Sequence, residues 1–429
     1  MGESLTQQIN QGLTEKVILV GLETPNDPDG LVLLKELGRL ADTAGAQVVD
    51  QILQKRLQPD PSFFIGRGKV EELRERCAVF KADLVIFNDE LTPVQVRNLE
   101  QILNCRVLDR TNLILDIFAQ RARTNEGKLQ VELAQLRYLL PRLIGQGMNL
   151  SRLGAGLGTR GPGETKLETD RRHIRRRIRV LEQELDKIRQ RRKLQRERRE
   201  RLGLPVIALV GYTNAGKSTL LNRLSKTETL VEDQLFSTLD TLSRLVELPD
   251  GRLVLVSDTV GFVRKLPHHL VAAFRATLEE VREADLILHV VDLSSPEMEN
   301  EKKAVEQVLR EIGADNKATL LVYNKLDLLP GDGREWIGLG DSAAVLISAK
   351  KDQGIPELLQ QIAQSLPRPG AKVALAIPLA ETRFLSLIHS QGTVFSQDYQ
   401  SDRILITAWL EPRLLAQLKP FIVKEYCEE

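Results

Sequence analysis

The sequence predicts an α/β protein built from four parts. These are a small parallel α/β N-terminal domain at 14–122, a helical hairpin (an antiparallel coiled coil) at 123–202, a P-loop α/β domain at 203–368 and a small α+β C-terminal module at 370–429. Strand and helix signals alternate through the first part. Leucine and isoleucine recur at coiled-coil spacing in the second. In the third, a glycine-rich phosphate-loop motif joins a strand to a helix.

The N-terminal part alternates short apolar runs with helical periodicity, which is typical of a parallel sheet covered by helices. We expect strands at 16–22, 47–53, 84–87 and 106–108, and helices at 31–44, 69–80, 93–103 and 113–122. Gly66-Arg-Gly-Lys69 precedes one of these helices, and a plain turn is favoured over a phosphate site there.

The hairpin is predicted from two apolar stripes with spacings of four and three residues. They are Leu129, Leu133, Leu136, Leu140 and Leu143, and then Ile174, Ile178, Leu181, Leu185 and Ile188. Two such stripes can bury each other. Pro141 is expected to kink the first helix, because proline clashes with the preceding turn.

The hairpin connection and second helix are unusual in composition. Residues 153–165 hold five glycines, and Arg171–Arg201 carries 15 Lys or Arg against five Asp or Glu, a local charge of +10 on a chain whose remainder carries −9. A solvated basic face is the simpler interpretation, and an RNA-facing arm is the alternative. The candidate RNA contacts are Arg152, Arg160, Lys166, Arg171 and Arg172.

The phosphate loop fits G-x-x-x-x-G-K-[ST] and lies between an apolar run at 205–210 and a helix opening at Thr219. Glycines let backbone N–H groups approach phosphate, Lys217 is expected to reach the β- and γ-phosphates, and Ser218 to bind Mg²⁺. The predicted nucleotide-binding residues are Gly211, Tyr212, Thr213, Asn214, Ala215, Gly216, Lys217 and Ser218.

Three further motifs follow predicted strands in the order that a GTP-binding domain requires. A carboxylate at Asp327 can accept hydrogen bonds from N1–H and the exocyclic amine of guanine, which adenine cannot supply. A glycine N–H at Gly261 can meet the γ-phosphate. The motif residues are Asp258, Thr259, Val260 and Gly261, then Asn324, Lys325, Leu326 and Asp327, then Ser348, Ala349 and Lys350.

The loop 226–244 is expected to carry the magnesium-sensing threonine of the first switch. Thr238 is the candidate, within Phe236, Ser237, Thr238, Leu239 and Asp240, and Thr241 is the alternative. We therefore predict Ser218 and Thr238 as metal ligands, and Lys217, Thr238 and Gly261 as the catalytic set.

Phe262 stands where Ras-like GTPases carry a water-orienting glutamine, which predicts slow intrinsic hydrolysis, with the missing positioning group supplied by a partner or by a rearrangement. In some GTPases an asparagine at the place of Asn214 helps to hold a monovalent cation. The expected cofactors are therefore GTP and Mg²⁺, with K⁺ as an additional candidate.

Composition excludes several classes of protein. Three cysteines without C-x-x-C spacing argue against a zinc ribbon or disulfide framework. No apolar run approaches the ~18 residues of a membrane span. Gly2 with Thr6 matches a myristoylation pattern only loosely. We expect a cytoplasmic protein, with at most a minor fraction peripheral to membranes.

These motifs together resemble the HflX-type ribosome-associated GTPases, relatives of the Obg group of P-loop GTPases. The shared phrases are F-I-G-R-G-K at 64–69, G-T-R-G-P-G-E-T-K-L-E-T-D-R-R-H-I at 158–174, G-Y-T-N-A-G-K-S-T-L at 211–220, F-S-T-L-D at 236–240, D-T-V-G-F-V-R-K-L-P-H-H-L-V-A-A-F at 258–274, N-K-L-D at 324–327 and S-A-K at 348–350. The resemblance implies a GTPase that binds the large ribosomal subunit and its rRNA, with the hairpin tip near the RNA core and hydrolysis stimulated by the ribosome.

The expected function is GTP binding and hydrolysis in ribosome rescue or splitting, protein synthesis or ribosome biogenesis. We expect a monomer without DNA binding or stable membrane association. Two alternatives stay open: a GTPase that serves tRNA modification, and a binding module in which nucleotide sets affinity and turnover is incidental.

Overall fold

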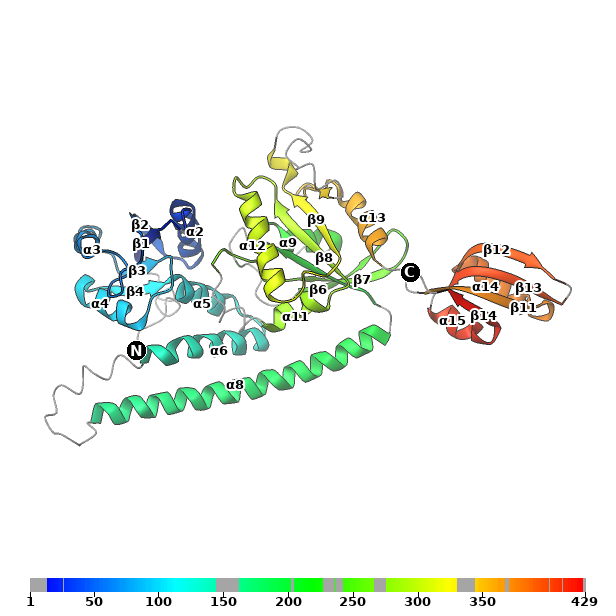
Figure 1. The fold of residues 1–429 in the computed structure, drawn as a ribbon, viewed down its shortest axis with the longest axis horizontal. Coiled ribbons are helices and arrows are strands. Elements are labelled where there is room, and N and C mark those ends of the chain that lie inside the picture. Colours follow the sequence, from blue (N-terminus) through cyan, green and yellow to red (C-terminus); the bar gives the residue numbers. More distant parts are fainter. Residues whose placement is uncertain are drawn as a thin grey trace.

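The computed structural model describes residues 14–25, 27–143, 162–201, 204–226, 236, 242–265, 275–329, 344–366, 370–400, 402–410 and 412–426. It contains three sheets and a long helical arm (Figure 1). The mixed α/β fold class predicted from the sequence is confirmed.

The N-terminal sheet is parallel, with strand order β2-β1-β3-β4. Alternate side chains point to opposite faces, so one face packs on α2 and α5 and the other on α3 and α4. The elements are β1 (Lys16–Glu23), α2 (Gly30–Thr43), β2 (Gln47–Lys55), α3 (Arg67–Phe80), β3 (Leu84–Phe87), α4 (Pro93–Leu103), β4 (Arg106–Asp109) and α5 (Arg110–Arg121).

Helix α5 begins three residues earlier than predicted. Asp109, the last residue of β4, caps it by accepting from the backbone N–H of Asn112 at 2.9 Å. An N-cap carboxylate satisfies a donor that the first helical turn leaves unpaired.

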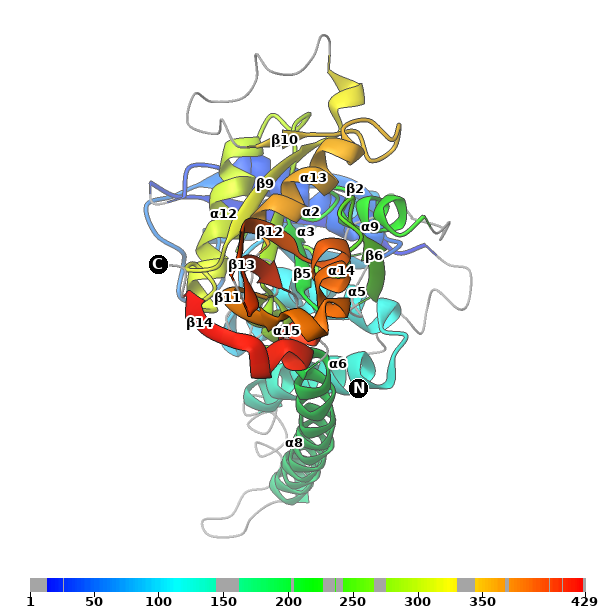
Figure 2. The same ribbon diagram turned by 90° about the vertical axis from the view of Figure 1, so that its right-hand side faces the viewer.

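The arm consists of α6 (Asn125–Arg142) and α8 (Pro162–Arg201). Its core is formed by Leu129, Leu133, Leu181 and Leu185, with Leu136, Ile178 and Ile188 packed against them. Figure 1 shows α8 running beside α6 and on toward the P-loop domain, and Figure 2 looks nearly along its axis. The predicted pairing is therefore seen, although Leu140, Leu143 and Ile174 lie outside this cluster.

Two details of the arm differ from the prediction. Pro141 lies in the last turn of α6, which ends one residue later at Arg142, so it does not kink the body of this helix. Helix α8 begins at Pro162, inside the segment assigned to the loop. Proline fits the first turn of a helix, where its missing N–H costs nothing.

The third part is a six-stranded sheet, β10-β9-β8-β5-β7-β6, in which β6 is antiparallel to β7 and the other pairs are parallel. Its elements are β5 (Val206–Gly211), α9 (Lys217–Leu224), β6 (Leu242–Glu247), β7 (Leu253–Asp258), α11 (Arg275–Glu283), β8 (Leu286–Asp292), α12 (Met298–Glu311), β9 (Thr319–Asn324), β10 (Val345–Leu346) and α13 (Ile355–Ser365). Parallel strands present their carboxyl ends at one edge, which gathers the motif loops.

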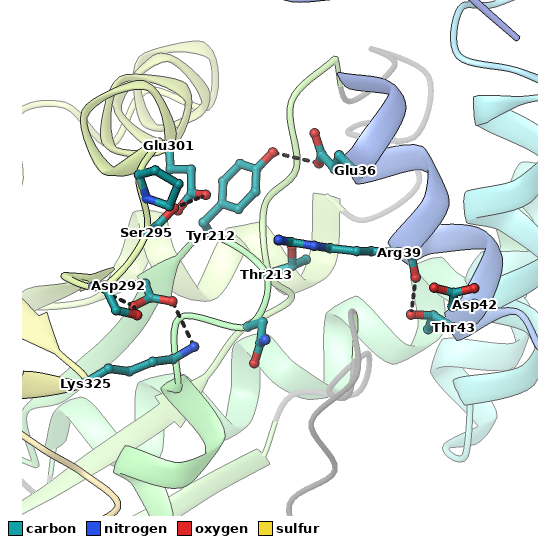
Figure 3. Close-up of a pocket in the computed structure, with 13 residues that line it drawn as sticks. Glu36, Arg39, Asp42, Thr43, Tyr212, Thr213, Asp292, Ser295, Glu301 and Lys325 are labelled. Carbon is teal, nitrogen blue, oxygen red and sulfur yellow. Dashed lines mark hydrogen bonds and ion pairs between the residues drawn. The ribbon is translucent and has the colours of Figure 1, made fainter. Parts of the chain in front are cut away.

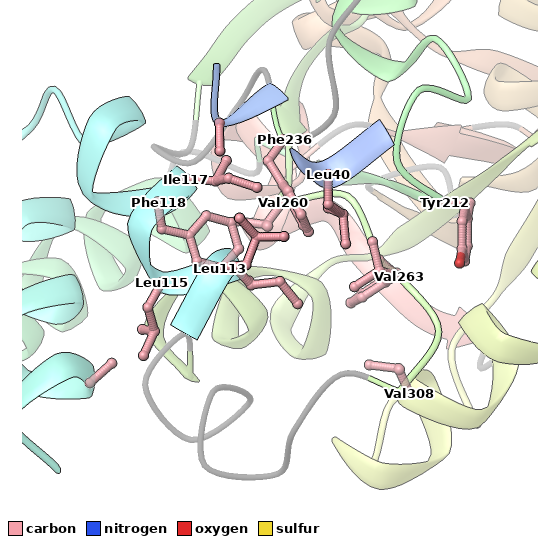
Figure 4. Packing of buried hydrophobic residues seen from close by; sticks show 14 of the residues in the cluster. Leu40, Leu113, Leu115, Ile117, Phe118, Tyr212, Phe236, Val260, Val263 and Val308 are labelled. Carbon is pink, nitrogen blue, oxygen red and sulfur yellow. The ribbon is translucent and has the colours of Figure 1, made fainter. Parts of the chain in front are cut away.

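One apolar core runs from the N-terminal domain into the P-loop domain. Side chains of α5, including Leu113 and Phe118, pack with Val260 and Phe236 (Figure 4). The rings of Phe118 and Phe236 meet edge to face with their centroids 4.6 Å apart. The two α/β domains thus share buried surface beside the nucleotide motifs.

The C-terminal module is an antiparallel sheet of order β12-β13-β11-β14 with its own core. Its elements are β11 (Ala371–Pro378), α14 (Arg383–Gln391), β12 (Thr393–Tyr399), β13 (Arg403–Leu410), α15 (Pro412–Leu418) and β14 (Ile422–Tyr426). The sequence did not predict β14, which pairs with β11 across a long stretch of chain. No helix among the described residues has the length and apolar character needed to cross a membrane.

Candidate functional site

The phosphate loop connects β5 to α9 and needs glycine at both ends. A Cβ on Gly211 would lie 2.2 Å from the carbonyl oxygen of Val290, and one on Gly216 would lie 2.2 Å from Nδ2 of Asn324. Gly216 also has a left-handed φ of +93°. The close approach of neighbouring strands and motifs therefore excludes any side chain at these positions.

Lys217 is buried in this loop and already oriented. Its Nζ donates to the carbonyl oxygens of Gly211 at 3.1 Å and Tyr212 at 2.9 Å. An ammonium group has three donors, so one is left for a phosphate oxygen. Burial lowers the pKa of Lys217 to about 8, and the Asp258 carboxylate acts in the opposite direction.

The end of β7 brings a carboxylate beside the loop. Ser218 Oγ donates to Asp258 Oδ2 at 2.7 Å, and Asp258 is fully buried. Thr259 Oγ1 donates to the carbonyl oxygen of Leu209 at 2.6 Å, which holds the start of the D-T-V-G segment on β5. The arrangement orients the Ser218 hydroxyl at the mouth of the loop.

Gly261 lies directly against the phosphate loop. A Cβ there would come 2.9 Å from Cα and Cγ2 of Thr213 and 3.1 Å from Nζ of Lys217. The Lys217 amine and the Gly261 backbone therefore approach each other closely enough for one small anionic group to contact both.

Asn324 joins the N-K-L-D and S-A-K segments to the phosphate loop. Its Nδ2 donates to the carbonyl oxygen of Ala215 at 2.8 Å, and its Oδ1 accepts from the backbone N–H of Ala349 at 3.0 Å. Ser348 Oγ donates to Asp327 Oδ1 at 2.6 Å. Hydrogen bonds thus connect the phosphate loop, the N-K-L-D segment and the S-A-K segment along one edge of the sheet.

The remaining predicted residues of this edge are placed as follows. Lys325 Nζ pairs with Asp292 Oδ2 at 2.8 Å, and Leu326 opens a short 3₁₀ turn. Lys350 is exposed, and its carbonyl oxygen accepts from Arg223 at 3.0 Å. Asn214, at the top of the phosphate loop, has a positive φ of 63°.

The first-switch prediction falls mostly outside the described residues. Ser237, Thr238, Leu239, Asp240 and the alternative Thr241 are not described. Phe236 is described and is 2% exposed in the core shared by the two α/β domains.

The candidate RNA contacts are only partly described. Arg152 and Arg160 lie outside the described residues, and the side chain of Lys166 does too, although its backbone belongs to α8. Arg171 is half-buried near Glu168, with a 3.8 Å ion pair, and Arg172 is exposed.

Part of the basic run on α8 is used inside the protein. Ion pairs join three of its arginines to carboxylates of α6 and α11: Arg177 with Glu132, Arg192 with Glu126, and Arg196 with Glu283. The positive charge that the arm has available for a polyanion is therefore smaller than the local charge of +10.

Residues of the N-terminal domain also border the site, and sequence reasoning missed them. A cavity of about 480 Å³ lies between α2 and the phosphate loop (Figure 3). Its lining includes Glu36, Arg39, Asp42 and Thr43 from α2, and Tyr212, Thr213 and Asn214 from the loop. No local pattern in α2 signals this contact.

Comparisons with known proteins agree with this geometry. Three family models match: a GTP-binding GTPase N-terminal domain at 32–119, a GTP-binding GTPase middle region at 121–199 and a 50S ribosome-binding GTPase at 206–325.

Relatives match over nearly their full lengths. GTPase HflX of Caldanaerobacter subterraneus subsp. tengcongensis is 49% identical over 95% of this chain and 94% of its own. GTPase HflX of Escherichia coli (strain K12) is 42% identical over 95% of this chain and 97% of its own. The crystal structure of SsGBP with GDP is 26% identical, with a TM-score of 0.46, over 82% of this chain and 98% of that one. On the family models and the HflX relatives, the chain belongs to the HflX family of GTPases, and it binds and hydrolyses GTP.

Proposed function

We propose that this GTPase works as a nucleotide switch on the large ribosomal subunit and its rRNA, in ribosome rescue or splitting, protein synthesis or ribosome biogenesis. The match of 206–325 to a 50S ribosome-binding GTPase supports the partner. The exposed basic residues of α8, including Arg172, support contact with an RNA backbone. The proposed RNA contacts remain Arg152, Arg160, Lys166, Arg171 and Arg172.

The proposed nucleotide contacts follow the connected edge of the sheet. The observation that carries them is Asn324, whose amide bridges Ala215 and Ala349 and so fixes the base-reading loops to the phosphate loop. Asp327 is proposed to accept from guanine, Lys217 to hold the β- and γ-phosphates, and Gly261 to donate its N–H to the γ-phosphate. Phe262 offers no side-chain hydrogen bond to water, which supports slow intrinsic turnover.

Ser218 and Thr238 are the proposed magnesium ligands. The Ser218 hydroxyl, fixed by Asp258, suits a hard cation. Within the described ranges no three His, Cys, Asp or Glu side chains gather into a metal site, and phosphate oxygens and water would complete the coordination. When bound, Mg²⁺ neutralises charge on the phosphates.

Asn214 is the proposed contact for K⁺. A potassium-stimulated rate would support it, and equal hydrolysis rates in Na⁺ and K⁺ would remove it.

Co-sedimentation with purified ribosomal subunits tests the proposed partner. The chain is expected to pellet with large subunits in a nonhydrolysable GTP analogue and much less in GDP, while small subunits and tRNA retain little. Deleting 154–163 is expected to weaken pelleting and to leave GTP affinity unchanged. Nucleotide-independent pelleting, or equal retention by tRNA, would contradict the proposal.

A further inference from the structure

Tyr212 links the phosphate loop to the N-terminal domain. Its hydroxyl donates to Oε1 of Glu36 on α2 at 2.7 Å, across 176 residues of chain (Figure 3). The same hydroxyl accepts from the backbone N–H of Arg264 at 2.8 Å. Tyr212 is 8% exposed, and burial raises the pKa of its phenol, so the hydroxyl stays protonated and keeps both roles.

The segment after Gly261 is held on the phosphate loop along its backbone. The Phe262 N–H donates to the carbonyl oxygen of Gly211 at 3.1 Å, and the Thr213 N–H donates to the carbonyl oxygen of Phe262 at 2.8 Å. Farther along the same segment, the Arg264 N–H donates to the Tyr212 hydroxyl. This bond differs from the other two because it depends on a side chain that the N-terminal domain orients.

The N-terminal domain holds the other end of this connection through a buried arginine. Arg110 Nη2 lies 3.0 Å from Oε1 of Glu36, and its side chain is 2% exposed. The same Nη2 donates to the carbonyl oxygen of Arg264 at 2.8 Å. Arg264 is thus fixed at its carbonyl by Arg110 and, through Tyr212 and Glu36, at its N–H.

The Arg264 side chain adds contacts to both sides of the junction. Its guanidinium bonds to Glu297 of the P-loop domain at 2.9 Å and to Asp29 before α2 at 3.3 Å. The next residue, Lys265, pairs with Asp27 and Asp89 of the N-terminal domain. The segment that follows Gly261 is therefore clamped between the two domains.

We propose that Tyr212, Glu36 and Arg110 are positioning residues for the segment 261–264, so that the N-terminal domain raises the affinity for GTP relative to GDP. The proposal rests on the assignment of Gly261 to the γ-phosphate made above. Ordering this segment costs conformational entropy, and a segment already held in place leaves less of that cost to the ligand. GDP lacks the γ-phosphate, so its affinity does not benefit from the ordered segment.

Coupling between domain docking and GTP binding acts in both directions, which allows a partner to regulate GTP affinity. If docking of the N-terminal domain favours GTP, then GTP favours docking by the same factor. A partner that pulls this domain away from the P-loop domain will therefore weaken GTP binding and leave GDP binding unchanged.

Equilibrium binding of GDP and of a nonhydrolysable GTP analogue to the full-length chain tests the proposal. Tyr212→Phe keeps the ring and removes the hydroxyl. It is expected to weaken analogue binding about threefold to tenfold, the range for one hydrogen bond, with GDP affinity within about twofold. Glu36→Ala is expected to act in the same direction. The double variant is expected to lose little more than Glu36→Ala alone, because removing Glu36 already breaks its contact with Tyr212.

Two controls separate this role from general destabilisation. Tyr138→Phe also removes a buried tyrosine–carboxylate bond, to Asp109 at 2.7 Å, and is expected to lower the unfolding temperature without changing the ratio of the two affinities. Lys35→Gln, on an exposed residue of α2, is expected to change neither.

The results distinguish a failure of the positioning role from a failure of the assignment of Gly261 to the γ-phosphate. Equal losses for both nucleotides in Tyr212→Phe, or losses that add in the double variant, would overturn the positioning role. A Gly261→Ala variant that retains full analogue affinity would instead overturn the assignment of Gly261 to the γ-phosphate.

Discussion

The side-chain amide of Asn324 donates to the carbonyl oxygen of Ala215 at 2.8 Å, although the two residues are 109 positions apart in the chain. This bond connects the loop proposed to read the base with the loop proposed to hold the phosphates. The site consequently behaves as one unit, and a defect in either loop is expected to reach the other.

Asn324→Ala tests that connection. The change leaves the buried carbonyl of Ala215 and N–H of Ala349 without their partner, which costs about 1–3 kcal/mol each. We expect GDP and GTP affinities to fall together, by about tenfold or more. Isothermal titration measures this, with Asn316→Ala, on an exposed residue, as control. Loss for one nucleotide alone would contradict the shared role.

Asp327→Asn is expected to move base preference away from guanine. An amide can donate where the carboxylate accepted, so it opposes the N1–H and exocyclic amine of guanine and suits a base with a carbonyl in place of that amine. GTP affinity should drop about tenfold to a hundredfold and XTP affinity should rise. Competition binding with both nucleotides measures the shift, and unchanged GTP affinity would refute the assignment of Asp327.

Gly261→Ala is expected to impair triphosphate binding and hydrolysis. The new methyl group would meet Thr213 at 2.9 Å and Lys217 Nζ at 3.1 Å, so the segment has to move off the loop. We expect hydrolysis to slow about tenfold or more, with a smaller effect on GDP affinity. Gly68→Ala, where a Cβ would meet nothing within 4 Å, is the matched control.

Nucleotide binding is expected to depend on pH through Lys217. Its pKa is lowered to about 8 by burial, and phosphate oxygens favour the charged form, so binding near pH 8 takes up protons. GDP affinity should therefore fall as the pH rises from about 7 to about 8.5. Calorimetry in two buffers of different ionisation enthalpy counts the protons. Zero uptake at pH 8 would contradict the assignment.

The same shift has an opposite effect on the nucleotide-free protein. Because the pKa of Lys217 is lower in the folded chain than its ordinary value of 10.5, the unfolded chain binds more protons between about pH 8 and that value. This lysine therefore penalises folding at neutral pH, and the penalty disappears as the pH rises through that window.

The sequence predicted the parts of the site that depend on local patterns. Strand, glycine-rich loop and helix are adjacent in the chain, so the phosphate loop and the motifs at Asp258, Asn324 and Ser348 could be placed on strand ends. Glu36 could not be found, because its contact with Tyr212 spans 176 residues and α2 shows only an ordinary amphipathic pattern. The strand β14 was missed for a similar reason: five residues have too little periodicity, and their pairing with β11 is long-range.

The charge pattern predicted the arm less well than the apolar stripes did. The apolar stripes predict a buried contact between the two helices, and Leu133 of α6 and Leu181 of α8 lie in that contact. A run of arginines does not reveal its partners, and Arg177 and Arg192 pair with carboxylates of α6. The neighbours in the folded chain decide which of these charges remain exposed.

We expect a ribosomal partner to complete hydrolysis chemistry for which Phe262 supplies no water-orienting group. GTP turnover should be measured for the purified chain alone and with large ribosomal subunits, at low and moderate salt. We predict slow turnover alone and strong stimulation by large subunits that weakens as salt rises, because RNA contacts are screened. Fast turnover by the chain alone, or no stimulation despite normal GTP binding, would contradict the account.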